Sequence, residues 1–214
     1  IAVVVQRMVQ SQTSGVLFTV DPISNDRNRI TIEAVFGLGE AIVSGAITPD
    51  YYVVSKDSTE ILERKTAHQE WMLARNPEYA NGAKDTNVWL DVPPKKQRVQ
   101  KLTNDQIVAL AQMAKNIEDL YAFPQDIEWA QEDGRLYIVQ SRPITTLKDA
   151  EDSFKGMLRK TSAKAIVSGA SASPGYGQGP VKIIRDASVI HLVEKGDVLV
   201  TEMQTAGSVK SFGS

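Results

Sequence analysis

The sequence contains no cysteine, and only two of its 214 residues are histidine. Without cysteine the chain can form neither a disulfide framework nor a thiolate metal site, which fits a cytoplasmic protein. No run of residues reaches the roughly 18 apolar positions that a membrane-spanning helix needs. An excess of basic residues is also lacking, because the formal net charge is −2. We therefore expect neither a membrane protein nor a nucleic-acid-binding protein, since phosphate contacts need a basic surface.

Apolar residues make up 42% of the chain and charged residues 23%, which is typical of a globular protein with an apolar core. The β-branched and alternating segments predict strands at 2–6 (a buried strand), 16–20, 29–34, 51–54, 60–64, 181–184 and 198–201. A capping box formed by Thr103 and Gln106 predicts a helix that begins there and ends before Pro124. Residues 67–98 are polar and irregular, so we expect loops there.

Two later segments, 126–131 and 136–142, are predicted to form a β-hairpin. Alternate side chains of a strand point to opposite faces, so the length of the loop decides which residues share a face. A two-residue turn at 133–134 would set Glu128 opposite Val139. A three-residue loop at 132–134 would set Glu128 opposite Ile138. We predict the three-residue loop, because it suits a glycine in the left-handed region and separates polar from apolar residues.

This loop also gathers four polar side chains on one face of the hairpin. They are Asp126, Glu128, Gln140 and Arg142. Carboxylate and amide oxygens hold Mg²⁺, which also binds phosphate oxygens, and arginine binds phosphate through two parallel hydrogen bonds. The face therefore has the residue types of a Mg-nucleotide site. The alternative is a solvent-exposed hairpin with a glutamate–arginine pair, which is common and contributes little stability. The pattern alone leaves both interpretations open.

Several segments resemble the ATP-binding domain of the phosphoenolpyruvate synthase family, whose architecture pyruvate phosphate dikinases and rifampicin phosphotransferases share. The segments are 14–22, 33–45, 124–130 and 139–143, within a resemblance that covers about 1–203. The resemblance implies an α/β (α+β) chain that carries the second subdomain of an ATP-grasp fold and the truncated start of a swivelling phosphohistidine domain. Its implied boundaries are 1–146 for the ATP-grasp subdomain, 147–165 for a linker and 166–214 for the phosphohistidine domain.

The resemblance also assigns candidate nucleotide-binding residues in the first part of the chain. Gln6, Arg7 and Met8 would lie near the adenine, with backbone groups forming the hydrogen bonds. The segment Gly-Leu-Gly-Glu that ends at Glu40 is a weaker candidate, because glycines allow close approach to a ligand but also simply make turns. Glu40 is kept as a candidate cofactor-binding residue. Glu33 lies on a strand beside this segment and either faces the nucleotide or is an exposed strand residue, and the second interpretation is favoured.

In the hairpin, the resemblance implies one role for each polar residue. Glu128 and Gln140 match the metal-binding and phosphate-binding positions, so the implied cofactors are ATP and Mg²⁺. Arg142 matches the arginine that contacts phosphate, and it is the candidate catalytic residue. Asp126 matches a nearby acidic residue of the nucleotide site.

The function implied by the resemblance is phosphoryl transfer from Mg-ATP to a carrier histidine and on to pyruvate. The products would be phosphoenolpyruvate, AMP and phosphate. His68 and His191 lack the glycine-rich context of the family's carrier, and we expect both to be ordinary surface or structural residues. The first ATP subdomain and the pyruvate domain lie outside this chain, so we expect the isolated chain to be inactive. The resemblance suggests that the parent enzyme forms a homo-oligomer, but the sequence itself does not reveal the oligomeric state. The alternatives are the ATP module of another dikinase or antibiotic phosphotransferase, and a non-catalytic degenerate fragment.

Overall fold

The computed structural model describes residues 3–22, 24–81, 84–144, 178–184 and 187–201. Its centre is a six-stranded antiparallel sheet with the strand order β4-β3-β2-β1-β7-β8. The strands are β1 (Thr13–Phe18), β2 (Arg29–Phe36), β3 (Asp50–Ser55), β4 (Ile61–Lys65), β7 (Gln125–Glu132) and β8 (Arg135–Pro143). The mixed α/β class is thus confirmed, with sheets that are mostly antiparallel.

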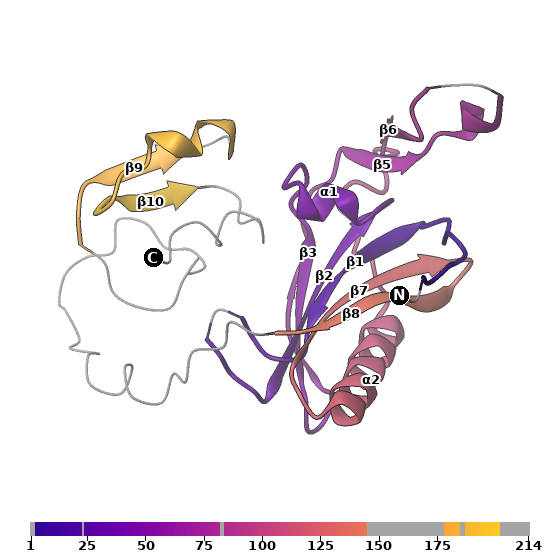
Figure 1. Ribbon diagram of the computed structural model, residues 1–214, viewed down its shortest axis with the longest axis horizontal. Coiled ribbons are helices and arrows are strands. Elements are labelled where there is room, and N and C mark those ends of the chain that lie inside the picture. Colours follow the sequence, from indigo (N-terminus) through magenta and orange to yellow (C-terminus); the bar gives the residue numbers. More distant parts are fainter. Residues whose placement is uncertain (1–2, 23, 82–83, 145–177, 185–186, 202–214) are drawn as a thin grey trace.

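The long helix α2 (Asn104–Tyr121) packs along one face of this sheet (Figure 1). It begins where predicted, since the Thr103 side chain accepts from the Gln106 N–H and the Gln106 side chain accepts from the Thr103 N–H. The apolar stripe of the helix is buried against side chains from four strands. The main members of this core are Leu17, Ile30, Ile32, Tyr52, Ile107, Leu110, Ile127 and Trp129. No helix in the described part of the chain is long and apolar enough to span a bilayer.

The opposite face of the sheet is covered over only part of its area. The short helix α1 (Glu40–Val43) and the strand β5 (Trp71–Arg75) form a smaller apolar cluster there. Its buried members are Val16, Val35, Ala41, Ile42, Ile47 and Leu73. This face also carries the polar side of the β7–β8 hairpin, where β7 is partly covered and Gln140 and Arg142 on β8 are exposed.

The segment 67–98, predicted as loops, instead contains a projecting arm of regular structure (Figure 1). The strand β5 pairs antiparallel with β6 (Asn87–Asp91), and the 3₁₀ turn η1 (Pro77–Asn81) lies between them. The prediction failed because these strands bury little apolar surface. Leu73 is their one fully buried apolar side chain among the described residues, while Trp71 and Trp89 are about half exposed.

A buried ion pair fastens this arm to the sheet. The Lys101 ammonium lies 2.7 Å from Asp50 Oδ1, and both side chains are fully inaccessible to solvent. Asp50 also accepts from the Ala67 N–H at 2.8 Å, the Lys101 N–H at 2.9 Å and the Tyr52 hydroxyl at 2.6 Å. A buried charge is tolerated only when it is paired and hydrogen-bonded, and this carboxylate meets both conditions.

The predicted buried strand at 2–6 is wrong for the residues of it that the structure describes. Residues 3–6 have no regular structure, and Val3, Val4 and Val5 are 82%, 85% and 94% exposed. A β-branched run becomes a strand only where another strand pairs with it and a core covers it. Neither condition is met by the described residues around this segment.

Near the end of the chain, two short strands form a separate parallel pair. These are β9 (Val181–Ile184) and β10 (Val198–Thr201), and the 3₁₀ helix η2 (Ala187–Leu192) lies between them in sequence. Both strands are where the sequence predicted them. The expected linker at 147–165 and the first part of the expected second domain lie outside the described residues.

Candidate functional site

The β7–β8 hairpin turns through two residues, Asp133 and Gly134. Their φ values are 49° and 78°, and positive φ at both central positions is the mark of a type I′ turn. The turn sets Glu132 opposite Arg135, so the predicted three-residue loop is wrong. An Asp-Gly pair is among the preferred sequences for this turn, and it was the signal that should have decided the loop length.

A β-bulge on β8 then returns the polar residues to one face, as predicted, although the predicted pairing of Glu128 with Ile138 is wrong. The register shifts after Trp129, which lies opposite Ile138, and Val139 is left without a partner in β7. Beyond the bulge, Glu128 lies opposite Gln140. Bulges of this kind re-aim the side chains that follow them.

The four polar residues therefore do share one face, because Asp126 lies opposite Arg142 in the same register. The Arg142 guanidinium donates to Asp126 Oδ2 from Nε at 2.8 Å and from Nη2 at 2.7 Å. The arginine side chain is 55% exposed, so the ion pair contributes little stability. Its effect is to orient the guanidinium over the polar face.

Glu128 and Gln140 differ from this pair in having no internal partner. Glu128 is partly buried and Gln140 is exposed. Within the described residues, neither side chain takes part in a hydrogen bond or an ion pair. In a directly opposed antiparallel pair the Cβ atoms lie about 4.5–5.5 Å apart, so a carboxylate and an amide oxygen here can reach one cation together.

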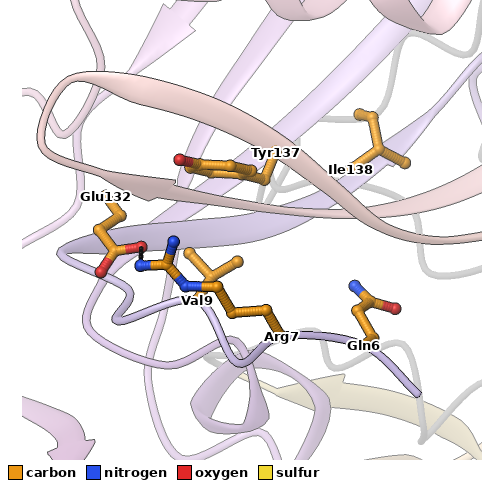
Figure 2. Close-up of a pocket in the computed structure, with 6 residues that line it drawn as sticks. All are labelled: Gln6, Arg7, Val9, Glu132, Tyr137 and Ile138. Atoms are coloured by element: carbon orange, nitrogen blue, oxygen red, sulfur yellow. Dashed lines mark ion pairs between the residues drawn. The ribbon is translucent and has the colours of Figure 1, made fainter.

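The same face continues to the tip of the hairpin, where a pocket of about 190 Å³ opens (Figure 2). Its lining residues are Gln6, Arg7, Val9, Glu132, Tyr137 and Ile138. Figure 2 shows the N-terminal segment passing alongside the hairpin, with the Arg7 side chain extended towards Glu132. The two charged groups are 3.7 Å apart, and the Gln6 amide lies 3.5 Å from the Val139 carbonyl oxygen.

Two of the three predicted adenine-binding residues thus line the pocket. Met8 does not; its side chain is 58% exposed, and it is absent from the lining. Tyr137 and Glu132 were missed as site residues. The correct hairpin register would have identified them, because it places both side chains on the same face as Glu128.

Glu40 begins α1 and is tied to the arm rather than to the hairpin. Its carboxylate accepts from the Asn87 side-chain amide on β6 at 3.1 Å. Gly37, just before α1, has a φ of 87°. The backbone there lies so close to β5 that the Leu38 N–H donates to the Leu73 carbonyl oxygen at 2.7 Å. No contact within the described residues joins Glu40 to the four polar residues of the hairpin.

Glu33 corrects an expectation, because it is partly buried rather than exposed. It lies on β2 between Ile32 and Ala34, which face the α2 core, so its own side chain points to the face that carries the hairpin residues. Burial raises the pKa of the Glu33 carboxyl from 4.5 to about 7. Within the described residues this carboxyl has no hydrogen-bond or ion-pair partner.

Neither histidine lies in a cluster of metal-binding side chains within the part of the chain that the structure describes. His68 lies on the arm, where Nε2 is 3.1 Å from the Gln97 side-chain oxygen. His191 lies in η2, in the other part of the described chain. The described residues contain no group of three or more metal-binding side chains from His, Cys, Asp and Glu.

Comparison with known proteins identifies relatives for nearly the whole chain. The family described as pyruvate phosphate dikinase, AMP/ATP-binding domain, matches residues 1–161. The phosphoenolpyruvate synthase of Pyrococcus furiosus is 49% identical over 214 residues, covering 99% of this chain and 26% of that protein. The probable phosphoenolpyruvate synthase of Methanocaldococcus jannaschii is 43% identical over 212 residues, covering 99% and 17%.

A relative with another name matches a shorter stretch. The rifampicin phosphotransferase of Bacillus cereus is 44% identical over 147 residues, covering 69% of this chain and 16% of that protein. The chain thus spans about a quarter or less of the length of these relatives.

Proposed function

We propose that the chain, which belongs to the family of pyruvate phosphate dikinase AMP/ATP-binding domains, binds Mg-ATP along the polar face of its β7–β8 hairpin. The observation that carries this proposal is the pair Glu128 and Gln140, which lie directly opposite each other without internal partners. Unpaired carboxylate and amide oxygens at this spacing suit a hard divalent cation.

The nucleotide would lie along the hairpin from its tip towards the start of β7. The pocket beside Arg7 and Tyr137 would take the adenine end, and Arg142 would meet the phosphates. Glu132 lies six positions after Asp126 along β7. At about 3.3 Å per residue this face is roughly 20 Å long, enough for an extended nucleotide.

Glu128 and Gln140 would hold Mg²⁺, because, of the four polar side chains on the hairpin, they are the two without hydrogen-bond or ion-pair partners among the described residues. When bound, the cation would offset part of the negative charge of the triphosphate. Arg142 would contact the phosphate group that is transferred, and Asp126 would hold its guanidinium in place. Phosphoryl transfer requires mainly such positioning and charge stabilisation from the protein.

For the whole protein we propose the reaction after which the phosphoenolpyruvate synthase relatives are named. Phosphoryl would pass from Mg-ATP to a carrier histidine outside this chain and on to pyruvate. In this proposal 1–146 is the second subdomain of an ATP-grasp fold and 166–214 is the start of a phosphohistidine domain. The similarity to a rifampicin phosphotransferase favours one alternative, the same nucleotide site serving a different acceptor.

Calorimetric titration of Mg-ATP into the chain tests the nucleotide site. We expect Glu128→Gln and Arg142→Gln each to weaken binding by about tenfold or more, since one charge-assisted contact is worth about 1.5–3 kcal/mol. Glu63→Gln is the matched control, because Glu63 is an exposed glutamate on β4, at the other edge of the sheet. The proposal fails if the folded wild-type chain does not bind, or if all three variants bind equally well.

A further inference from the structure

We propose that β6, the outer strand of the projecting arm, is an interaction surface for a second copy of this chain. The β6 strands of the two copies would pair antiparallel across a two-fold axis, so that the two arms would join into one continuous sheet. The inference goes beyond the proposed function and concerns a different part of the molecule, the β5–β6 arm.

The backbone of β6 has a free edge. Where the arm begins, the Val92 N–H donates to the Glu70 carbonyl oxygen at 2.7 Å, so this pair is hydrogen-bonded. Bonded and non-bonded pairs alternate along an antiparallel ladder, so every second residue of β6 directs its N–H and C=O groups away from β5. These residues are Asn87, Trp89 and Asp91. Within the described part of the chain, these backbone groups have no hydrogen-bond partner.

The other edge of the arm is occupied by the rest of the protein. The Leu38 N–H donates to the Leu73 carbonyl oxygen on β5 at 2.7 Å. The Gln69 side-chain amide donates to the Trp71 carbonyl oxygen, also on β5, at 2.9 Å. The strand β6 is therefore the side of the arm that a further strand can reach (Figure 1). An open strand edge is a template for pairing with another chain.

The two edge strands of the main sheet are protected in ways that β6 lacks. Residues 63–65 of β4 are an exposed glutamate, arginine and lysine, and β8 contains the bulge at Val139. Charged side chains and bulges on edge strands prevent unwanted pairing between chains. The centre of β6, residues 88–90, is apolar instead, and its Trp89 and Leu90 side chains are 49% and 41% exposed.

The sequence of β6 is complementary to itself in an antiparallel pair. Its five residues are polar, apolar, aromatic, apolar and polar in order. With the two-fold axis at Trp89, this side chain would meet its counterpart in the second copy. Val88 would then lie opposite Leu90, and Asn87 opposite Asp91, so that no like charges are opposed. Aromatic and branched apolar pairs across strands stabilise a sheet.

This register would also continue apolar rows of side chains through both arms. On one face Leu73 pairs with Trp89, so the row would run through both tryptophans to the second Leu73. On the other face Met72 pairs with Leu90, which would lie opposite Val88 of the second copy. The pairing would thus remove from water apolar surface that each arm exposes alone, and such burial drives association.

Sedimentation equilibrium of the folded chain over a range of protein concentrations tests the inference. We expect wild type to reach the mass of two chains. Trp89→Lys would oppose two ammonium groups, and Trp89→Glu would oppose two carboxylates, so each variant alone should dimerise at least about tenfold more weakly. An equimolar mixture of the two variants should dimerise again, because opposite charges then face each other. Circular dichroism verifies that both variants are folded.

Leu62→Lys is the matched control, because Leu62 is an apolar residue, 50% exposed, on the edge strand β4 of the main sheet. It should dimerise like wild type. A wild-type chain that remains a monomer at its highest soluble concentration would overturn the inference. A dimer that persists in Trp89→Lys would do so too, as would a mixture of the two folded variants that remains monomeric. The nucleotide site is tested separately, by the titration with Mg-ATP.

Discussion

At the scale of single residues, Glu33 on β2 and Glu128 on β7 lie on the same face of the sheet. Burial raises the pKa of the Glu33 carboxyl from 4.5 to about 7. An acid with a raised pKa in the folded state binds its proton more tightly there than in the unfolded chain. The stability that this proton contributes is complete below pH 4.5 and is lost as pH rises through about 7.

Glu33→Gln should therefore change stability in a pH-dependent way. Above pH 7 we expect the variant to be more stable than wild type, by up to about 3 kcal/mol, since each pKa unit corresponds to about 1.4 kcal/mol. Near pH 4.5 the two should be equally stable. Urea unfolding at both pH values measures this difference, and an equal effect at both would contradict the assigned burial.

The burial of Glu33 was beyond sequence analysis, and the reason is physical. Strand alternation places the Glu33 side chain on the other face of the sheet from Ile32 and Ala34, which agrees with the structure. Its accessibility depends on tertiary packing over this face of the sheet, where α1 and β5 form a small apolar cluster with Val16 and Val35. The face on which Glu128 lies was more predictable, because it is set within a single hairpin.

At the scale of elements, Gly15 allows β1 to pack closely between β2 and β7. A Cβ atom at Gly15 would lie 1.8 Å from the Glu33 carbonyl oxygen and 2.9 Å from the Trp129 ring. Gly15→Ala should force β1 and β2 apart and destabilise the fold by about 1–3 kcal/mol or more.

The control for this substitution is Gly134→Ala at the hairpin turn. A Cβ there meets nothing within 4 Å, and the cost arises only from φ of 78°. We expect about 1–2 kcal/mol for an L-residue in that conformation. Thermal and urea unfolding of both variants compare the two effects, and a Gly15→Ala variant of wild-type stability would contradict the close packing.

The β5–β6 arm depends on the buried pair of Asp50 and Lys101. Lys101→Met would leave the Asp50 carboxylate buried without its cation, and we expect a loss of about 3–5 kcal/mol. Lys65→Met removes an exposed pair, since Lys65 is 64% exposed, and should cost less than about 1 kcal/mol. Similar unfolding midpoints for the two variants would show that the buried pair does not hold the arm.

The elements differ in how far the sequence predicts them. The helix α2 and most strands were predicted because capping boxes and alternation are local. The hairpin was predicted with the wrong loop, and its polar face is correct because the bulge at Val139 offsets that error. The arm was not predicted, because its strands bury almost nothing themselves and are held by contacts with Asp50 and α1.

At the scale of the whole molecule, the sheet has one face closed by α2 and another that is open beside α1. The chain is about a quarter of the length of its Pyrococcus furiosus relative. In our proposal the carrier histidine and the acceptor site lie outside it. We therefore expect no phosphoenolpyruvate from the isolated chain, ATP and pyruvate in a coupled assay, and detectable turnover would contradict this division of the reaction.

The central claim is that the open face of the β7–β8 hairpin holds the metal–nucleotide complex. Backbone amide NMR spectra of the chain, recorded with ATP and a small amount of Mn²⁺ in place of Mg²⁺, test it most directly. A paramagnetic ion broadens the signals of nearby nuclei, so we predict that broadening is strongest around Glu128 and Gln140 and requires ATP. Amides of α2, which are farther from the ion on the other side of the sheet, should broaden much less. Broadening centred elsewhere, or none with ATP present, would contradict the account.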